Sequence, residues 1–219
     1  MKNFCIIHFV LLSIFFAFTG CRKFKQEKIV AKAEPYTVTN LYPIERLPSY
    51  FNRVVVLPVY TKDEDSPLLA FADDVFRQEI IQQKIFETIH LSPSQMQSIF
   101  GKKRVSSVDP LPNNFLSRLE FESQANGVLF IEVLSYRPYR PISLSVRAKL
   151  VDIKTGELNW AVDEMIDAGH ASVQVAAQQF QSRSQVRALS DKTQGSTIQS
   201  PRVFTKFAAS MIFETLPNR

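Results

Sequence analysis

The sequence predicts an α+β fold, in which a single small mixed sheet containing an antiparallel three-strand meander is covered by helices. Three observations favour this class. Residues 53–60 form a short apolar stretch rich in β-branched side chains, which is typical of a buried strand. Residues 128–166 contain three strand patterns in succession, as a meander requires. Apolar residues at helical spacing precede and follow this region, so helices are available to cover the sheet.

A helix is predicted directly after the first strand. Ser66 and Pro67 supply an N-cap and a first helical position, and the helix should extend to about Lys84. A second strand is expected over 85–91. The helix rests on apolar residues at helical spacing, namely Leu68, Phe71, Ala72, Val75, Phe76 and Ile80.

Two short helices should connect this strand to the meander. Residues 92–95, Ser-Pro-Ser-Gln, match a capping box, and Gly101 is a suitable stop, so a helix is expected over 94–100. A second helix is expected over 115–125, with Asn114 as its N-cap.

The meander begins with residues 128–133, which are continuously apolar, as expected of a central strand. Residues 142–151 instead alternate, which predicts a strand with one solvated face that carries Arg147 and Lys149. Residues 152–157 form a turn, and alternation resumes from Leu158 in the returning strand.

Two helices are expected at the end of the chain. Residues 170–190 are rich in glutamine and have only a thin apolar seam, so this helix should be exposed on most sides. Residues 203–212 show a stronger apolar face, which should dock on the core. The predicted order is β-α-β-α-α-β-β-β-α-α, without an internal repeat.

The start of the chain has the features of a bacterial lipoprotein signal. An apolar run behind Lys2 is too short to span a bilayer comfortably, and it closes on Phe18-Thr19-Gly20-Cys21. We expect residues 1–20 to be a signal peptide and Cys21 to carry a diacylglycerol and a further acyl chain such as palmitate. The alternatives are a secretory signal with a coincidental cysteine, or an uncleaved anchor. Phe18 stands where the motif prefers Leu.

Residues 21–50 are predicted to be a lipidated tether, and 51–219 an α/β partner-docking domain. The tether is charged at first and then contains Pro35, Pro43 and Pro48. Arg22 rather than aspartate follows Cys21, which favours the outer membrane, with the domain facing the periplasm. Cys5 leaves with the signal and Cys21 is acylated, so no disulfide is expected.

Composition indicates one globular core. The chain has 219 residues, of which 45% are hydrophobic and 21% charged. Its formal charge of +5 favours anionic headgroups or an acidic partner, but the basic residues are scattered. Nucleic acid is therefore not an expected partner.

Three segments carry a family resemblance: Arg53-Val-Val-Val-Leu-Pro, Ala125-Asn-Gly-Val-Leu, and Leu150-Val-Asp-Ile-Lys-Thr-Gly-Glu-Leu-Asn-Trp160. They resemble the CsgG/TolB-like periplasmic lipoprotein superfamily over roughly residues 53–167. Its members include the curli secretion channel's periplasmic domain and activators of penicillin-binding proteins. The resemblance implies a small α/β sandwich that docks partners, and it brings no catalytic motif. A secretion pore would need further membrane hairpins, whereas both alternating strands here are required by the core sheet.

No catalytic, metal or cofactor site is predicted. His90 and His170 stand apart from other ligand-type residues, and no Gly-x-Ser-x-Gly elbow occurs. Residues 63–65, Asp-Glu-Asp, precede a helix and favour its dipole. Residues 101–104 are interpreted as a solvated helix exit, and Trp160 as core.

The best candidate contact surface is the segment between two meander strands, Tyr136-Arg-Pro-Tyr-Arg-Pro141. Arg137, Tyr139 and Arg140 are residue types that anchor interfaces, and the prolines would present them rigidly. The alternative is a stiff connection whose arginines are solvated or pair with carboxylates such as Asp163.

Our leading hypothesis is therefore a non-enzymatic docking or assembly factor of the cell envelope. It would be anchored to the membrane through Cys21 and would bind an envelope protein or a peptidoglycan-associated partner. The first alternative is a subunit of an oligomeric outer-membrane secretion or assembly complex. The second, an envelope hydrolase, has no supporting constellation of residues.

Overall fold

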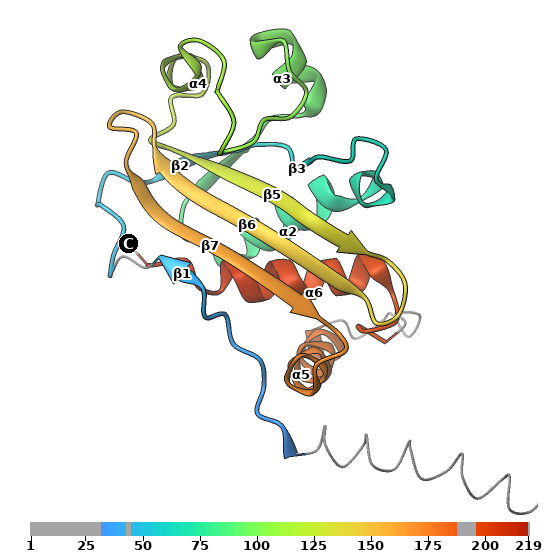
Figure 1. Ribbon diagram of the computed structural model, residues 1–219. Helices are drawn as coiled ribbons and strands as arrows, with labels where there is room; N and C mark the ends of the chain where they lie inside the picture. Colours follow the sequence, from blue (N-terminus) through green and yellow to red (C-terminus); the bar gives the residue numbers. More distant parts are fainter. Residues whose placement is uncertain (1–31, 43–44, 188–195, 219) are drawn as a thin grey trace, which may run out of the picture.

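The computed structural model describes residues 32–42, 45–187 and 196–218. Within these ranges, one open mixed sheet of seven strands is covered by five α-helices, which confirms the predicted fold class (Figure 1). The strand order is β1-β7-β6-β5-β2-β4, and β3 also pairs with β5. The strands are β1 (Leu41–Tyr42), β2 (Arg53–Val56), β3 (Tyr60–Thr61), β4 (Glu87–His90), β5 (Gly127–Arg137), β6 (Ser143–Asp152) and β7 (Leu158–Asp167).

The helices lie close to their predicted positions. They are the 3-10 turn η1 (Pro67–Ala70) and the α-helices α2 (Ala72–Gln83), α3 (Pro93–Phe100), α4 (Phe115–Ser123), α5 (Ala171–Arg187) and α6 (Pro201–Phe213). The predicted signal peptide and Cys21 lie outside the described residues, as does the segment 188–195.

The meander of β5, β6 and β7 is antiparallel throughout, as predicted. Its second turn is fixed by Asp152, whose Oδ1 accepts hydrogen bonds from the backbone N–H groups of Lys154 (2.8 Å) and Thr155 (3.1 Å). Gly156 follows with a φ of 72°, a conformation that glycine adopts without steric cost. The Lys-Thr-Gly-Glu sequence therefore specifies this turn locally.

The other half of the sheet is parallel. β2 pairs with β4 on one side and with β5 on the other. The strand predicted over 53–60 is shorter than expected: β2 ends at Val56, and the pairing moves to β3 after Pro58. Proline lacks the N–H group that a continuous central strand would need.

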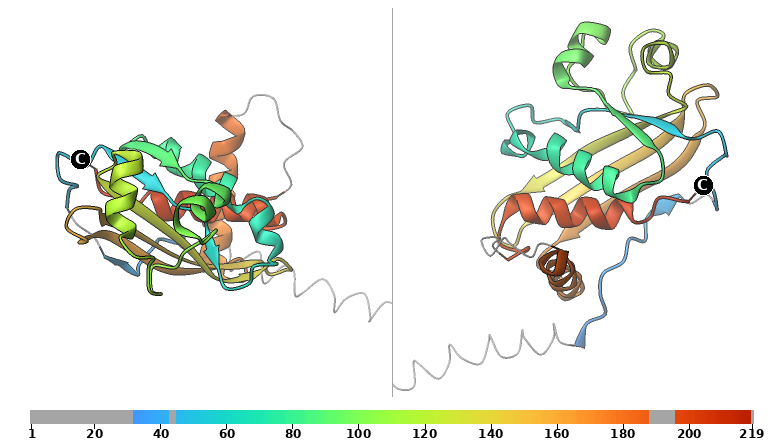
Figure 2. Two further views of the ribbon diagram at one scale, coloured as in Figure 1. Left: turned by 90° about the horizontal axis from the view of Figure 1, so that it is seen from above. Right: turned by 180° about the vertical axis from the view of Figure 1, so that it is seen from behind.

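One face of the sheet, here called the inner face, holds the main core. Seen from behind, α2 and α6 lie side by side across it (Figure 2). Trp160 is fully buried there, as predicted, and its Nε1 donates to Thr215 Oγ1 at 3.2 Å. α5 contributes the buried Val173, Ala176 and Ala177, and its half-buried Phe180 packs against Phe207 of α6. The glutamine-rich helix therefore docks by one narrow edge.

On the outer face, α3 and α4 cover only the end formed by β2 and the start of β5. Met96 of α3 and Phe115 and Leu119 of α4 pack there against Val128 and Phe130. The predicted capping box of α3 is present: Ser92 and Gln95 bond reciprocally, and Gly101 ends the helix with a φ of 73°. The part of the sheet formed by β6 and β7 is covered by helices on its inner face only (Figure 1).

Two predicted helix starts differ from the structure. The helix expected from Pro67 begins as the turn η1, is interrupted at Phe71 (φ −142°), and restarts as α2. Asn114 precedes α4 with a φ of 56°, and its side chain caps no backbone N–H. Asn114 adopts a left-handed backbone conformation just before the helix, and the residue type alone does not predict this conformation.

Part of the range predicted as tether packs on the domain. Leu47 is buried in the core, and β1 pairs with β7. Residues 36–42, here called the strap, run along the edge of the sheet from β1 toward α5 (Figure 1). The strap therefore links the sheet to the preceding residues of the chain.

Candidate partner-binding surfaces

The hairpin between β5 and β6 carries the three predicted contact residues. Tyr139 and Arg140 lie in its connection, where Tyr139 is 80% exposed and Arg140 is also exposed. Arg137 is the last residue of β5. The structure therefore places the three side chains on one connection, at the end of the meander far from α4.

Arg137 differs from its two neighbours because it is held in place. Its Nε donates to Pro141 O at 2.7 Å, and its NH2 donates to Asp167 Oδ2 at 2.9 Å. The carboxylate pairing that the sequence offered as an alternative thus exists, although its partner is Asp167. Asp163 instead pairs with Arg147 at 2.7 Å. Arg137 braces the hairpin, and Tyr139 and Arg140 remain available for contact.

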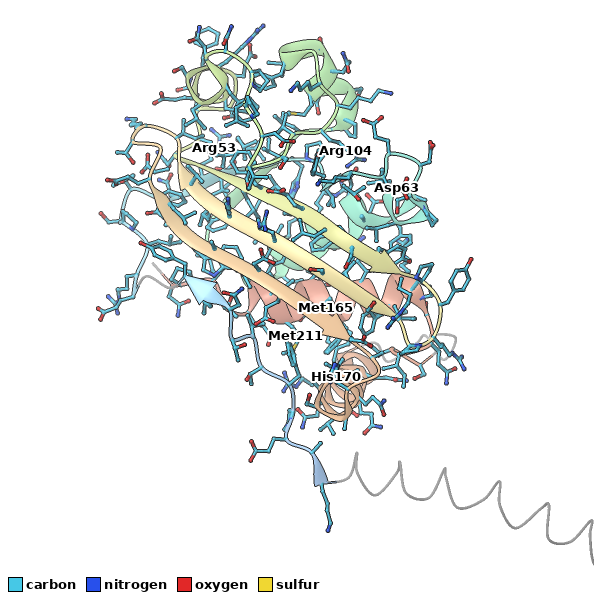
Figure 3. The ribbon with its side chains drawn as sticks, viewed as in Figure 1. Arg53, Asp63, Arg104, Met165, His170 and Met211 are labelled. Carbon is cyan, nitrogen blue, oxygen red and sulfur yellow. The ribbon has the colours of Figure 1, made fainter. Side chains whose placement is uncertain are left out.

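A second surface is the outer face of β6 and β7. Strand register places Tyr42, Ala161 and Lys149 in one row across β1, β7 and β6. On the same face, Met165 follows Asp163 by two residues along β7 and is 58% exposed. Figure 3 labels Met165 on this strand. Tyr42 is 54% exposed. Apolar and basic side chains therefore share an uncovered sheet face, a composition that suits a protein partner.

The sequence identified only part of this face. Arg147 and Lys149 follow from the alternation of their strand, which predicted a solvated side. Met165 and Tyr42 gave no such signal, because each adjoins another apolar residue, Ile166 and Leu41, so that alternation does not mark them as exposed. Only the pairing register brings them onto one surface.

A buried carboxylate lies where β5 borders this face. Glu132 of β5 accepts hydrogen bonds from Ser106 Oγ and Ser107 N, both at 2.9 Å. In register, Glu132 lies opposite Arg147, which in turn lies opposite Asp163. The hydrogen bonds of Glu132 hold the loop after α3 on the sheet. In the same row, Arg147 and Asp163 pair with each other.

A crevice lies at the carboxyl ends of β2 and β4. The chain leaves β2 for α2 on the inner face and leaves β4 for α3 on the outer face, and ligands often bind where connections diverge in this way. The crevice measures about 380 Å³ and is lined in part by Arg77, His90 and Ser92. Burial, with a smaller effect from Arg77, lowers the pKa of His90 to about 4.

His90 is therefore neutral above pH 5. Its Nε2 lies 3.1 Å from Thr88 Oγ1, a hydroxyl and not a carboxylate. Across the described ranges, no three His, Cys, Asp or Glu side chains gather closely enough to hold a metal ion. The other hollow, of about 580 Å³, lies by the loop after α3 and mixes Lys102 and Lys103 with Glu64 and Asp109.

A buried carboxylate also fastens the strap. Glu164 of β7 accepts hydrogen bonds from Tyr36 Oη (2.6 Å), Asn40 N (2.7 Å), Thr39 Oγ1 (3.1 Å) and Thr39 N. Burial alone would raise the pKa of Glu164, but these hydrogen bonds outweigh it, so the pKa lies below its usual value. Burial and the adjacent carboxylate raise the pKa of Tyr36. The pair therefore holds its bonded form, anionic Glu164 and neutral Tyr36, across the physiological range.

Comparison with known proteins gives the fold distant counterparts. No protein-family model and no curated protein sequence matches the chain. Among solved structures, it is similar to the PelC dodecamer from Paraburkholderia phytofirmans, with 14% identity, a TM-score of 0.48, and coverage of 84% of this chain and 98% of that one.

Two further similar structures cover less of the chain. Lipoprotein GNA1162 from Neisseria meningitidis has 14% identity and a TM-score of 0.42 over 64% of this chain and 99% of its own. The LpoB C-terminal domain from Escherichia coli has 15% identity and a TM-score of 0.37 over 65% and 92%. Similarity at this level carries no inference about activity. Within the described part of the chain, no helix is long and apolar enough to cross a membrane.

Proposed function

We propose that the protein is a lipid-anchored lipoprotein of the bacterial cell envelope that acts as a non-enzymatic docking or assembly factor in the periplasm. The observation that carries the proposal is the short apolar run closing on Phe18-Thr19-Gly20-Cys21. Arg22 after the cysteine supports retention at the outer membrane. An envelope protein or a peptidoglycan-associated protein is the proposed partner.

The docking role is supported by surface features of the domain. Tyr139 and Arg140 stand exposed on a hairpin braced by Arg137, so little conformational freedom would be lost when a partner binds them. The outer face of β6 and β7 adds two further exposed side chains, Met165 of β7 and Tyr42 of the edge strand β1. Tyrosine, methionine and arginine are enriched at protein interfaces.

Metabolic labelling tests the anchor. Cells that express the full chain are grown with an alkynyl fatty acid, and the protein is captured and compared with Cys21→Ser. The wild type should be labelled and Cys21→Ser should not, because the thioether needs the cysteine sulfur. Equal labelling of both would refute the lipoprotein assignment.

Crosslinking in intact cells tests the docking surface. Replacing Arg137, Tyr139 and Arg140 with alanine should abolish the crosslinks of the wild type to its envelope partner. The matched control replaces Lys102 and Lys103 with alanine. It also removes two positive charges, but from another exposed loop. Unchanged crosslinks in the triple variant would show that the hairpin is not the contact.

Self-association is the second candidate, and the uncovered outer face of β6 and β7 favours it. A second copy could cover Met165 and Tyr42 of the first. Native mass measurement in detergent separates the two cases, because a subunit of a closed assembly must appear as one large, defined multimer.

A further inference from the structure

We propose that Glu164 is a latch which fixes the strap to β7, so that the α5 end of the domain faces the membrane and the α3–α4 end points away from it. This inference rests on the proposed anchor at Cys21. It adds an orientation: it names the membrane-facing surface of the domain and the residue that determines it.

The contacts of the strap are concentrated on one residue. Four hydrogen bonds from Tyr36, Thr39 and Asn40 converge on the Glu164 carboxylate, whose side chain is buried. Hydrogen bonds to a charged acceptor are about twice as strong as neutral ones. No other side chain in the described ranges accepts more than one hydrogen bond from the strap.

Backbone pairing extends the attachment on both sides of the latch. Leu41 and Tyr42 pair with Val162 and Ala161, and Asn40 O accepts a hydrogen bond from Asp163 N at 3.2 Å. At the other end, Tyr36 N donates to Ser172 O at 3.0 Å, in the first turn of α5. The strap therefore lies on the edge of the sheet as far as α5.

This path determines where the chain leaves the domain. In Figures 1 and 2 the strap passes α5 and ends on the side of the domain opposite α3 and α4. In Figure 3, His170 lies at this lower end, whereas Arg104 lies at the opposite end. A membrane attached through the strap is thus nearest to α5.

The number of residues between Cys21 and the first attached residue limits how far the domain can lie from the membrane. About 11 residues separate Cys21 from Lys32, so this part of the chain can reach at most about 40 Å. If the strap is released, the next fixed point is Leu47, whose N–H donates to Asn218 O, and about 26 residues can then reach up to about 90 Å. The latched domain is consequently held close to the membrane by one end.

The exposed surface of α5 is compatible with this orientation. Its exposed side chains include the uncharged Gln178, Gln179 and Ser182 and the cationic Arg183. A polar surface with a positive charge can lie beside anionic lipid headgroups.

Energy transfer to labelled lipid tests the orientation in the full-length acylated protein reconstituted in nanodiscs. A donor dye is placed at His170→Cys or at Lys103→Cys, both exposed positions, and the acceptor is carried on a lipid headgroup. The His170 donor should transfer more strongly than the Lys103 donor. Equal or reversed transfer in the otherwise wild-type chain would refute the proposal.

Substitution of the latch supplies the second arm. Glu164→Ala should abolish the difference between the two donors, because the strap then leaves β7 and the domain tumbles on a longer linker. The matched control is Glu132→Gln, which perturbs another buried carboxylate on the opposite side of the meander and leaves the strap attached. The difference between donors should persist in this control.

Hydrogen exchange separates a failed latch from a failed anchor. In wild type the Thr39 and Asn40 amides should exchange slowly, and in Glu164→Ala they should exchange at the rate of an open chain. Slow exchange in Glu164→Ala would refute the latch whatever happens at Cys21. The donor dye is attached through a maleimide, which reacts with free thiols. If it labels Cys21, the sulfur of this cysteine is not acylated and the proposed anchor fails. The exchange result alone then decides on the latch.

Discussion

At the scale of single residues, Gly127 shows how closely the first strand of the meander approaches the chain before β2. A Cβ atom at this position would lie 2.2 Å from Cζ of Phe51, whose ring is fully buried. Because the ring is enclosed by core side chains, it cannot move aside freely. The glycine is needed here for space and not for an unusual φ.

We therefore expect Gly127→Ala to lower the free energy of unfolding by about 1–3 kcal/mol, as overpacked cores do. Urea unfolding followed by circular dichroism measures the change. Combining it with Phe51→Leu should recover part of the loss, since the smaller side chain makes room. A loss that is simply additive in the double variant would place the cause elsewhere.

Glu164 predicts a specific acid dependence. Its pKa is below that of an unfolded glutamate, near 4.3, so the unfolded chain binds its proton first as the pH falls. The stabilisation by the latch is therefore complete above about pH 5 and is lost as the pH falls through the folded pKa. The free energies of unfolding of wild type and Glu164→Gln should differ at pH 7, and the difference should shrink as the pH falls below 4 toward the folded pKa of Glu164. A constant difference would show that the carboxylate charge plays no part.

At the scale of elements, α3 was predicted closely because its signals are local. Ser92 caps the helix and Gln95 bonds back to it, so four residues define its start. The two-residue strands β1 and β3 could not be predicted in this way, because they are too short to show a period. Pro58 interrupts the apolar stretch visibly, yet only pairing with β5 makes the segment beyond it a strand.

Ser92→Ala should destabilise the protein by about 1 kcal/mol, the usual cost of losing an N-cap. The effect should appear in thermal unfolding as a lower Tm. Ser98→Ala, an exposed position in the same helix, is the control and should be neutral or slightly stabilising. If both substitutions lowered the Tm equally, the capping box would not be the source of the stability.

At the scale of the whole molecule, the sheet is protected unevenly. The segment Val128–Ile131 lies between β2 and β6 and has packed side chains on both faces. β4 and β1 are the edges, and most of β6 and β7 is covered by helices on the inner face only. Local opening should therefore begin at the edges.

Native-state hydrogen exchange checks this expectation. Amides of 128–131 should exchange slowest and amides of β4 fastest among the sheet strands. Glu164→Ala should accelerate exchange in the strap without affecting 128–131. If the central amides accelerated equally, the strap would belong to the global folding unit and could not act as a separable latch.

The sequence by itself determined the order of the main elements, the meander, the capping box, the buried Trp160 and the hairpin that carries Arg137, Tyr139 and Arg140. Each depends on neighbours within a few residues, where periodicity and turn chemistry act directly. The tertiary structure alone decided the parallel pairing of β2, the outer face that joins Met165 to Tyr42, and the attachment of the strap to Glu164. Those features join residues that are distant in the sequence, from 34 positions between Arg53 and Glu87 to 128 between Tyr36 and Glu164. Strand register, which no local pattern encodes, brings them together.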